Sequence, residues 1–303
     1  MKTVVIFGGA GYVGKHIIRR LAKNGYKIII PHQTKVNSAK LRLLGTTAQI
    51  IPIKFKSLKE NKIQSLIHNS DVIFNLKTMW DQKNQSFPKG ILDFNTDIVE
   101  SIKKSRKNTK FVFFSGLGVD ENKNSDRSIS IYKSEEYIKK HIKNCVIIRP
   151  GIIIGGGDKF LKGLLPLFKI SFFIPLFGNG VKKFQPVFID DISIAINKII
   201  YSNMLGKHTF EFVGNETFTY KDFYNYIASC FNKTRVLVPL PLSLVKLAVK
   251  ILEKTPISPL NSEQVKLFES DNLATNNFES FSDLDINPQD IREVIKNIIK
   301  KIK

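Results

Sequence analysis

The sequence predicts an α/β fold, with a doubly wound parallel sheet of the Rossmann type and a smaller C-terminal α/β lobe. Two observations predict it. Short β-branched runs alternate with segments of helical periodicity through the first half of the chain, and a glycine-rich turn at residues 8–14 joins the first run to the first helical segment. The 303 residues suffice for a core domain and a lobe, which we expect at residues 1–150 and 151–303, the second interleaved with the core sheet.

The first half contains the expected strands and helices in alternation. Strands are expected at residues 4–7, 27–30, 50–53, 72–76, 111–114 and 146–148. Helices are expected at residues 14–23, 38–44, 58–68, 91–104 and 134–143. Strand–helix–strand units of this length place consecutive strands parallel, with helices covering both faces of the sheet.

After residue 150, prolines and glycines break this rhythm and indicate the smaller lobe. Asp190 and Asp191 precede an amphipathic stretch at residues 192–200, which predicts a helix capped by a carboxylate. The apolar residues 164–177 fit either a surface for a partner or lipid or a buried contact between lobes. The basic, amphipathic residues 288–303 predict a terminal helix that either packs onto the small lobe or docks on an anionic membrane or partner.

The formal net charge of +21 raises the question of a nucleic-acid partner. Only eight of the 47 basic residues are arginines, and the lysines are spread along the whole chain, whereas readers of bases and phosphates rely on arginine forks. We expect no specific nucleic-acid partner and leave open a general attraction to polyanions or anionic membranes. We also expect no transmembrane segment, no targeting segment and a cytoplasmic location; the widely spaced Cys145 and Cys230 fit a reducing compartment.

The glycine-rich turn is the strongest chemical signal in the chain. Glycines at this position allow a tight turn from strand to helix, let a diphosphate approach bare backbone, and direct the helix N-terminus at it. We therefore expect dinucleotide binding by Gly8, Gly9, Ala10, Gly11, Tyr12, Val13 and Gly14.

The end of the second expected strand addresses the choice of dinucleotide. An NAD site expects an acidic residue there to hold the ribose 2′-hydroxyl, but the first acidic residue of the chain is Glu60. Gln33, Thr34 and Lys35 can instead donate to a 2′-phosphate. We favour NADP(H) over NAD(H), with a solvated surface lysine as the alternative for Lys35.

Five further blocks complete a family pattern across nearly the whole chain. They are DVIFNL at residues 71–76, FSGLGVD at 114–120, FQPVF at 184–188, VPLP at 238–241 and SDN at 270–272, with Arg149 and Pro150 between them. With the glycine-rich turn, they make the chain resemble the extended short-chain dehydrogenase/reductase superfamily. Within it, the chain is most similar to the family of the NAD(P)-binding accessory subunit of respiratory complex I, alpha-subcomplex subunit nine, and its bacterial relatives.

The resemblance implies a lobe that holds NADP(H) without established turnover, in a protein tied to the quinone-reducing respiratory chain or to ubiquinone metabolism. The partners it implies are respiratory-chain subunits or the cytoplasmic surface of the inner membrane. By position, it implies that Asn75, Leu76, Lys77, Ser115 and Pro150 line the nicotinamide side and that Phe55 and Lys56 lie near the adenine.

Turnover in this superfamily requires a Tyr-x-x-x-Lys pair on one helix face, where the lysine lowers the pKa of the phenol. In this chain Tyr132 is followed at the fourth position by Glu136, and aligning Lys133 to the lysine places Ile129 where tyrosine belongs. Either register breaks the pair, so Tyr132 and Lys133 are weak candidates only. We expect an accessory, structural or assembly protein; an active NAD(P)-dependent oxidoreductase or epimerase on a small or isoprenoid substrate, or a cofactor-sensing regulator, is the alternative.

The remaining candidates are weaker. The five histidines, at positions 16, 32, 68, 141 and 208, have neither metal-ligand spacing nor an adjacent carboxylate, so no metal site is expected. Trp80, with Met79, either packs in the core or covers a nicotinamide or quinone-like ring.

Overall fold

The computed structural model describes residues 2–120, 125–253 and 260–302. Its centre is a seven-stranded parallel sheet in the order β11-β6-β5-β4-β1-β2-β3. The strands are β1 (Thr3–Phe7), β2 (Lys27–His32), β3 (Ile50–Lys54), β4 (Val72–Asn75), β5 (Lys110–Phe114), β6 (Cys145–Pro150) and β11 (Lys207–Phe212). The first six strands have the doubly wound order of Rossmann folds, which confirms the predicted fold class.

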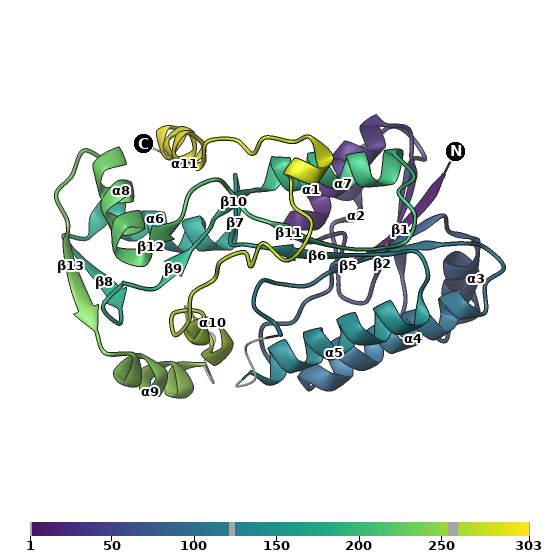
Figure 1. The fold of residues 1–303 in the computed structure, drawn as a ribbon, viewed down its shortest axis with the longest axis horizontal. Coiled ribbons are helices and arrows are strands. Elements are labelled where there is room, and N and C mark those ends of the chain that lie inside the picture. Colours follow the sequence, from purple (N-terminus) through teal and green to yellow (C-terminus); the bar gives the residue numbers. More distant parts are fainter. Residues whose placement is uncertain (1, 121–124, 254–259, 303) are drawn as a thin grey trace.

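Helices cover both faces of this sheet (Figure 1). One face carries α1 (Tyr12–Lys23), α2 (Ser38–Arg42) and α7 (Ile189–Tyr201); the other carries α3 (Asn61–Asn69), α4 (Phe94–Lys103), α5 (Asp126–His141) and the π-helix η1 (Pro88–Asp93). Alternate residues of β1 serve the two faces: Val4 and Ile6 are in one buried cluster, Val5 and Phe7 in the other. A strand buried on both faces must be apolar throughout, which explains the uninterrupted apolar runs.

The smaller lobe lies at one end of the sheet, on the left of Figure 1. Its helices are α6 (Lys159–Ile170), α8 (Tyr220–Cys230), α9 (Leu242–Leu252), α10 (Ser262–Lys266) and α11 (Ile291–Lys300). Its strands pair as β7 (Ile153–Ile154) with β10 (Val187–Phe188), β8 (Phe173–Phe177) with β13 (Val236–Leu240), and β9 (Lys183–Phe184) with β12 (Phe218–Thr219). Between these segments the chain returns to the large sheet to add α7, β11 and the short 3-10 helix η2 (Ser282–Leu284).

Most helices begin within three residues of the expected start, but α5 departs further in position and α7 differs in its capping. Helix α5 begins at Asp126, eight residues before the expected start, because the Ser125 side chain accepts a hydrogen bond from the Ser128 amide and caps it. The prediction of a carboxylate cap at Asp190 or Asp191 is wrong: α7 begins at Ile189 without a side-chain cap. These two carboxylates instead contact residues that are distant in the sequence. Asp190 contacts His16, and Asp191 accepts hydrogen bonds from the backbone and side-chain amides of Gln289.

The structure shows where the two apolar segments with two possible interpretations, residues 164–177 and 288–303, lie in the small lobe. Residues 164–177 form the end of α6 and β8, partly buried and partly exposed. The stripe of α11 that could have faced a membrane packs inward: Ile291, Val294, Ile295 and Ile299 belong to the small-lobe core, while Lys303 lies outside the described residues. No helix within the described ranges has the length and apolar character needed to cross a bilayer.

Candidate functional site

The glycine-rich turn connects β1 to α1 and has two glycines that the fold itself requires. Gly8 has a φ of +79°, and a Cβ there would lie 2.9 Å from the backbone of Leu76. A Cβ on Gly14 would lie 2.5 Å from the carbonyl oxygen of Gly9, because helix and turn pack closely there. Side chains are therefore excluded at both positions by the protein alone.

Gly11 is different, because protein packing does not exclude a side chain there. It has an ordinary extended conformation (φ −71°, ψ 179°) directly before α1, and a Cβ would meet only the Gly8 carbonyl oxygen, at 3.2 Å. Gly11 is exposed and borders a cleft of about 2390 Å³. Bare backbone at the N-terminus of a helix, facing a cleft, is suited to an anionic group that approaches closely.

The cleft brings together most of the predicted binding residues at the carboxyl ends of the sheet strands. Those that line it are Gly8, Gly9, Ala10, Gly11, Tyr12, Val13, Gly14, Gln33, Thr34, Lys35, Phe55, Leu76, Lys77, Ser115 and Pro150. Asn75 stands behind this lining: it is buried, its amide donates to Asn95 over 2.8 Å, and its carbonyl oxygen accepts from the Lys77 amide over 2.9 Å. Asn75 thus positions the loop after β4.

The β2 end of the cleft gathers hydrogen-bond donors. Lys77 Nζ donates to Gln33 Oε1 over 2.9 Å and lies 4.1 Å from the centre of the Phe94 ring, and burial lowers the pKa of its ammonium. Gln33 in turn donates to the carbonyl of Lys56 over 3.2 Å. The Lys77 side chain therefore extends to the β2 side, which differs from the expectation that it lines the nicotinamide side. The reason is topological, since β1 alone separates β4 from β2 in the described sheet, and Gly8, which follows β1 directly, has no side chain to block the path.

The β5 end of the cleft holds a polar atom that has no partner among the described residues. The hydroxyl of Ser115 is buried and lacks a hydrogen bond there, although its amide donates to Ile148 over 2.8 Å. A buried hydroxyl without a partner costs free energy, and a ligand atom in the cleft could satisfy it.

Tyr12, the first residue of α1, connects the turn to the small lobe. Its buried hydroxyl has no hydrogen bond within the described parts of the chain, and burial, together with the charges of Asp158 and Asp190, raises its pKa far above the usual range. Its ring meets His16 edge-on at 5.2 Å, and His16 Nδ1 lies 3.0 Å from Asp190 Oδ1.

Two of the five histidines have carboxylate partners that are distant in the sequence. Asp190 is 174 residues from His16, and His208 Nδ1 lies 2.7 Å from Glu279 Oε1, 71 residues away. Only the fold creates these pairs. Across the described ranges, no three His, Cys, Asp or Glu side chains form a group that could hold a metal ion.

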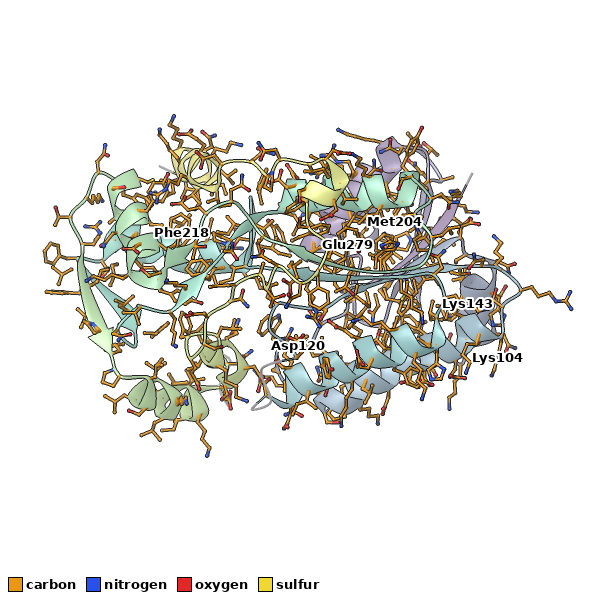
Figure 2. All side chains as sticks on the ribbon, in the orientation of Figure 1. Lys104, Asp120, Lys143, Met204, Phe218 and Glu279 are labelled. Carbon is orange, nitrogen blue, oxygen red and sulfur yellow. The ribbon has the colours of Figure 1, made fainter. Side chains whose placement is uncertain are left out.

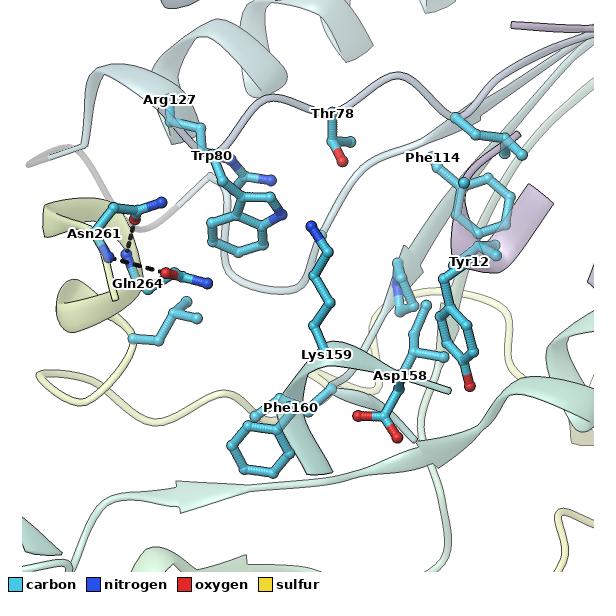
Figure 3. Close-up of a pocket in the computed structure, with 18 of the residues that line it drawn as sticks. Tyr12, Thr78, Trp80, Phe114, Arg127, Asp158, Lys159, Phe160, Asn261 and Gln264 are labelled. Carbon is cyan, nitrogen blue, oxygen red and sulfur yellow. Dashed lines mark hydrogen bonds between the residues drawn. The ribbon is translucent and has the colours of Figure 1, made fainter. Parts of the chain in front are cut away.

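The part of the cleft between the lobes carries three residues that Figure 3 shows facing one space. The Arg127 guanidinium stacks on the Trp80 ring at 3.8 Å from its centre, and its Nε donates to Met79 over 2.6 Å. Burial lowers the pKa of Arg127 to about 10. Lys159 extends across the cleft from α6, whose N-cap Asp158 accepts from the Leu161 amide over 2.7 Å. Trp80 is a candidate from the sequence, whereas neither cation is, because no motif marks them.

The weak catalytic candidates lie outside this cleft. Tyr132 and Lys133 sit on the exposed side of α5 and are not among the lining residues; the Tyr132 side chain is 37% exposed. Lys139, another cation on α5, has its ammonium 3.7 Å from Glu135. Neither Tyr132 nor Lys133 could therefore contact a ligand bound in the cleft.

A buried ion network lies behind the wall of the cleft formed by the end of β6. The Arg149 guanidinium donates to Glu135 over 3.0 and 2.7 Å and to Asp120 over 2.9 Å, and lies 3.8 Å from Glu211. Arg149, Glu135 and Glu211 are almost fully buried. This network fixes the end of β6, and so positions Pro150, which follows directly and lines the cleft.

The comparisons with known proteins agree with this architecture. Residues 1–168 match the model of the NmrA-like family. Over 96% of this chain and 75% of the relative, the chain is 27% identical to the Arabidopsis thaliana NADH dehydrogenase [ubiquinone] 1 alpha subcomplex subunit 9, mitochondrial, which confirms the resemblance found in the sequence.

Two solved structures share the fold at low sequence identity. One is the dTDP-glucose 4,6-dehydratase of Bacillus anthracis in complex with NAD, with a TM-score of 0.72, 16% identity, and coverage of 99% of this chain and 96% of that one. The other is the human epimerase family protein SDR39U1 with NADPH, with a TM-score of 0.70, 15% identity, and coverage of 98% and 99%. The two structures hold different dinucleotides.

Proposed function

Because this chain belongs to the NmrA-like family, we propose that it holds a dinucleotide in its cleft and acts as an accessory or assembly protein linked to respiratory complex I or ubiquinone metabolism. The observation that carries the proposal is the contrast between the two halves of the site. Bare backbone at Gly11 faces the cleft, while Tyr132 and Lys133 lie outside it.

The proposed fit of the dinucleotide follows the order of the strands. The diphosphate would bind the turn and the N-terminus of α1, because unpaired amides and the helix dipole favour negative charge. The nicotinamide portion would lie toward Ser115 and Pro150, where the unpartnered Ser115 hydroxyl is available to a ligand atom. The adenosine portion would lie toward β2 and Phe55.

We propose NADP(H) as the preferred dinucleotide. The β2 end offers hydrogen-bond donors and positive charge from Gln33, Thr34, Lys35 and Lys77. The end of β2, where NAD sites have an acidic residue for the ribose 2′-hydroxyl, has none in this chain. Since a 2′-phosphate carries negative charge, these donors favour it over a hydroxyl.

The proposed role is structural, because the cleft lacks the proton-transfer pair of the superfamily. A ligand that binds only the folded state stabilises that state by mass action. The relative from Arabidopsis is named as a subunit of NADH dehydrogenase, so we extend the proposal to respiratory-chain subunits or the cytoplasmic surface of the inner membrane as partners.

An active oxidoreductase or epimerase is the second candidate, and a specific observation favours it. Trp80, Arg127 and Lys159 line a space beside the expected nicotinamide position, where a stacked ring and two cations would suit an anionic or aromatic substrate. In that case the dinucleotide supplies hydride transfer, and Lys159 orients the substrate.

One experiment separates the two candidates. The purified protein is denatured, the released dinucleotide is identified by mass spectrometry, and NADPH absorbance is followed during incubation of fresh protein with carbonyl and quinone substrates. Retained, unreacted NADPH supports the accessory role. Substrate-linked oxidation that disappears in Lys159→Gln but survives in Tyr132→Phe would establish the second candidate instead. Protein that releases no dinucleotide and binds none on titration would refute both.

A further inference from the structure

The small lobe carries an exposed apolar tip where the ends of α6, β8, β13 and α11 meet. Its apolar side chains are Ile170, Phe172, Phe173, Val236 and Ile302, which are 84%, 52%, 61%, 40% and 44% exposed. Hydrogen bonds and ring contacts join these residues into one surface. The Val236 amide donates to the Phe172 carbonyl over 3.0 Å, and the rings of Phe172 and Phe173 meet edge-on at 5.2 Å.

The same tip is surrounded by positive charge. Lys169 donates to the Ile302 carbonyl over 3.0 Å, Lys233 to the Lys169 carbonyl over 3.0 Å, and Arg235 to the Phe168 carbonyl over 2.6 and 3.0 Å. Lys300 and Lys301 are exposed beside Ile302.

The charge of these five cations is uncompensated within the described chain. The hydrogen bonds of Lys169, Lys233 and Arg235 go to backbone carbonyls. None of the five cations has a carboxylate within ion-pair distance among the described residues. Elsewhere on the small lobe, cations do pair with acids: Lys246 lies 3.1 Å from Glu269. We call the five apolar residues and the five cations the basic tip.

We propose that the basic tip docks this protein on the surface of an anionic lipid bilayer. Exposed aromatic and aliphatic side chains enter the interface between headgroups and acyl chains, and the surrounding lysines bind anionic headgroups. Membrane contact is therefore assigned to the ends of α6, β8, β13 and α11, and not to the apolar stripe of α11, which is buried in the lobe.

Two other occupants fit the surface less well. A second copy of this chain would bring five uncompensated cations against five more, and like charges across an interface are strongly disfavoured. A nucleic acid would use the positive charge, but it offers nothing to the five exposed apolar side chains, and only one of the five cations is an arginine.

The inference rests on the proposed function in one respect, the contact with the inner-membrane surface. It does not require that the protein bind a dinucleotide. Protein that binds vesicles through the basic tip but holds no dinucleotide would uphold the inference while refuting the proposed function. Protein that holds NADPH but ignores vesicles would do the reverse.

The first test is vesicle flotation with phosphatidylcholine alone and with phosphatidylcholine containing one quarter phosphatidylglycerol. We expect the full chain to bind the mixed vesicles and not the neutral ones. Lys300→Gln/Lys301→Gln should weaken binding by about 30-fold. The matched control, Lys104→Gln/Lys143→Gln, removes the same charge at the opposite end of the molecule (Figure 2) and should change binding by about twofold at most. Equal losses in both variants would overturn the assignment, because binding would then follow net charge alone.

The second test concerns the apolar part. Phe172→Ser/Phe173→Ser should weaken vesicle binding by at least about tenfold, whereas Leu43→Ser/Tyr201→Ser, which alters two exposed side chains on the large domain, should leave it unchanged. Ile170→Ser serves as a second variant if thermal melting shows that the phenylalanine pair disturbs folding.

Two outcomes of these tests would overturn the proposal. One is loss of vesicle binding in Leu247→Ser/Ile251→Ser, on the exposed stripe of α9, together with full binding by the basic-tip variants. The other is concentration-dependent dimerisation in sedimentation that the phenylalanine variant abolishes, without vesicle binding by the unaltered chain.

Discussion

Replacing Gly11 by alanine should separate the needs of the ligand from those of the fold. The new methyl group would meet only the Gly8 carbonyl oxygen, at 3.2 Å, which asks for a shift of a few tenths of an ångström. The backbone there is extended with negative φ, so alanine also loses less conformational entropy on folding than glycine does. We expect the melting temperature of the ligand-free protein to change by less than about 2 °C.

Because Gly11 lines the cleft, the same methyl group would compete there with the proposed diphosphate for space. Displacing the diphosphate from one backbone amide removes a hydrogen bond to a charged group, which is worth about 1.5 to 3 kcal/mol. We therefore expect the Kd for NADPH, measured by isothermal titration calorimetry, to rise by about 10- to 100-fold.

Two matched glycine variants complete the design. Gly156→Ala adds a methyl group in open space outside the cleft lining and should alter neither quantity. Gly14→Ala forces a Cβ to 2.5 Å from the Gly9 carbonyl oxygen and should lower both the melting temperature and the affinity. NADPH affinity in Gly11→Ala equal to that of the unaltered protein would refute the assignment of the diphosphate to this turn.

Three further predictions concern cofactor choice and buried charge. Lys35→Ala should weaken binding of NADPH by about tenfold while leaving NADH binding unchanged in the same calorimetric titration; equal losses for both would contradict the proposed 2′-phosphate contact. Arg149→Met removes the guanidinium from the buried Glu211 and from the buried Glu135, which keeps only Lys139 at 3.7 Å. This change should lower the free energy of unfolding in urea by about 3 to 5 kcal/mol, whereas a loss below about 1 kcal/mol would show that the network is not buried as described. Burial lowers the pKa of Lys110 to about 8, below its value in the unfolded chain. Between about pH 8 and 10 the unfolded state therefore binds more protons, so the free energy of unfolding should rise with pH in this range. Lys110→Met should remove the contribution of Lys110 to this rise in pH-dependent thermal melts, and an unchanged slope would contradict the prediction.

Six of the seven strands of the large sheet could be predicted because their signals are local, whereas β11, from the second half of the chain, is not among the expected strands. Apolar runs of β-branched residues, such as those of β1 and β2, and the turn beginning at Gly8 are read from neighbouring residues alone. The sequence does not reveal the start of α5, because its N-cap is a single serine. It suggests a cap at Asp190 because acidic residues at a helix start resemble caps whether or not they cap.

The part of the site between the lobes could not be predicted, for a different reason. Arg127 and Lys159 come from different helices, and each reads in the sequence as one more surface cation in a lysine-rich chain. Arg127 reaches Trp80 through the packing of α5 against the loop after β4, and Lys159 joins them because the small lobe lies across the cleft. The same limit applies to the basic tip, whose members come from four elements and share no local pattern.

The arrangement around Arg149 also limits the order in which this sequence can diverge. One guanidinium lies against carboxylates from three separate segments, at Asp120, Glu135 and Glu211. A lineage that loses the arginine first passes through an intermediate with stranded negative charge in its interior, whereas a lineage that first neutralises the acids passes through milder steps. Descendants that lack this arginine should therefore also lack its acids.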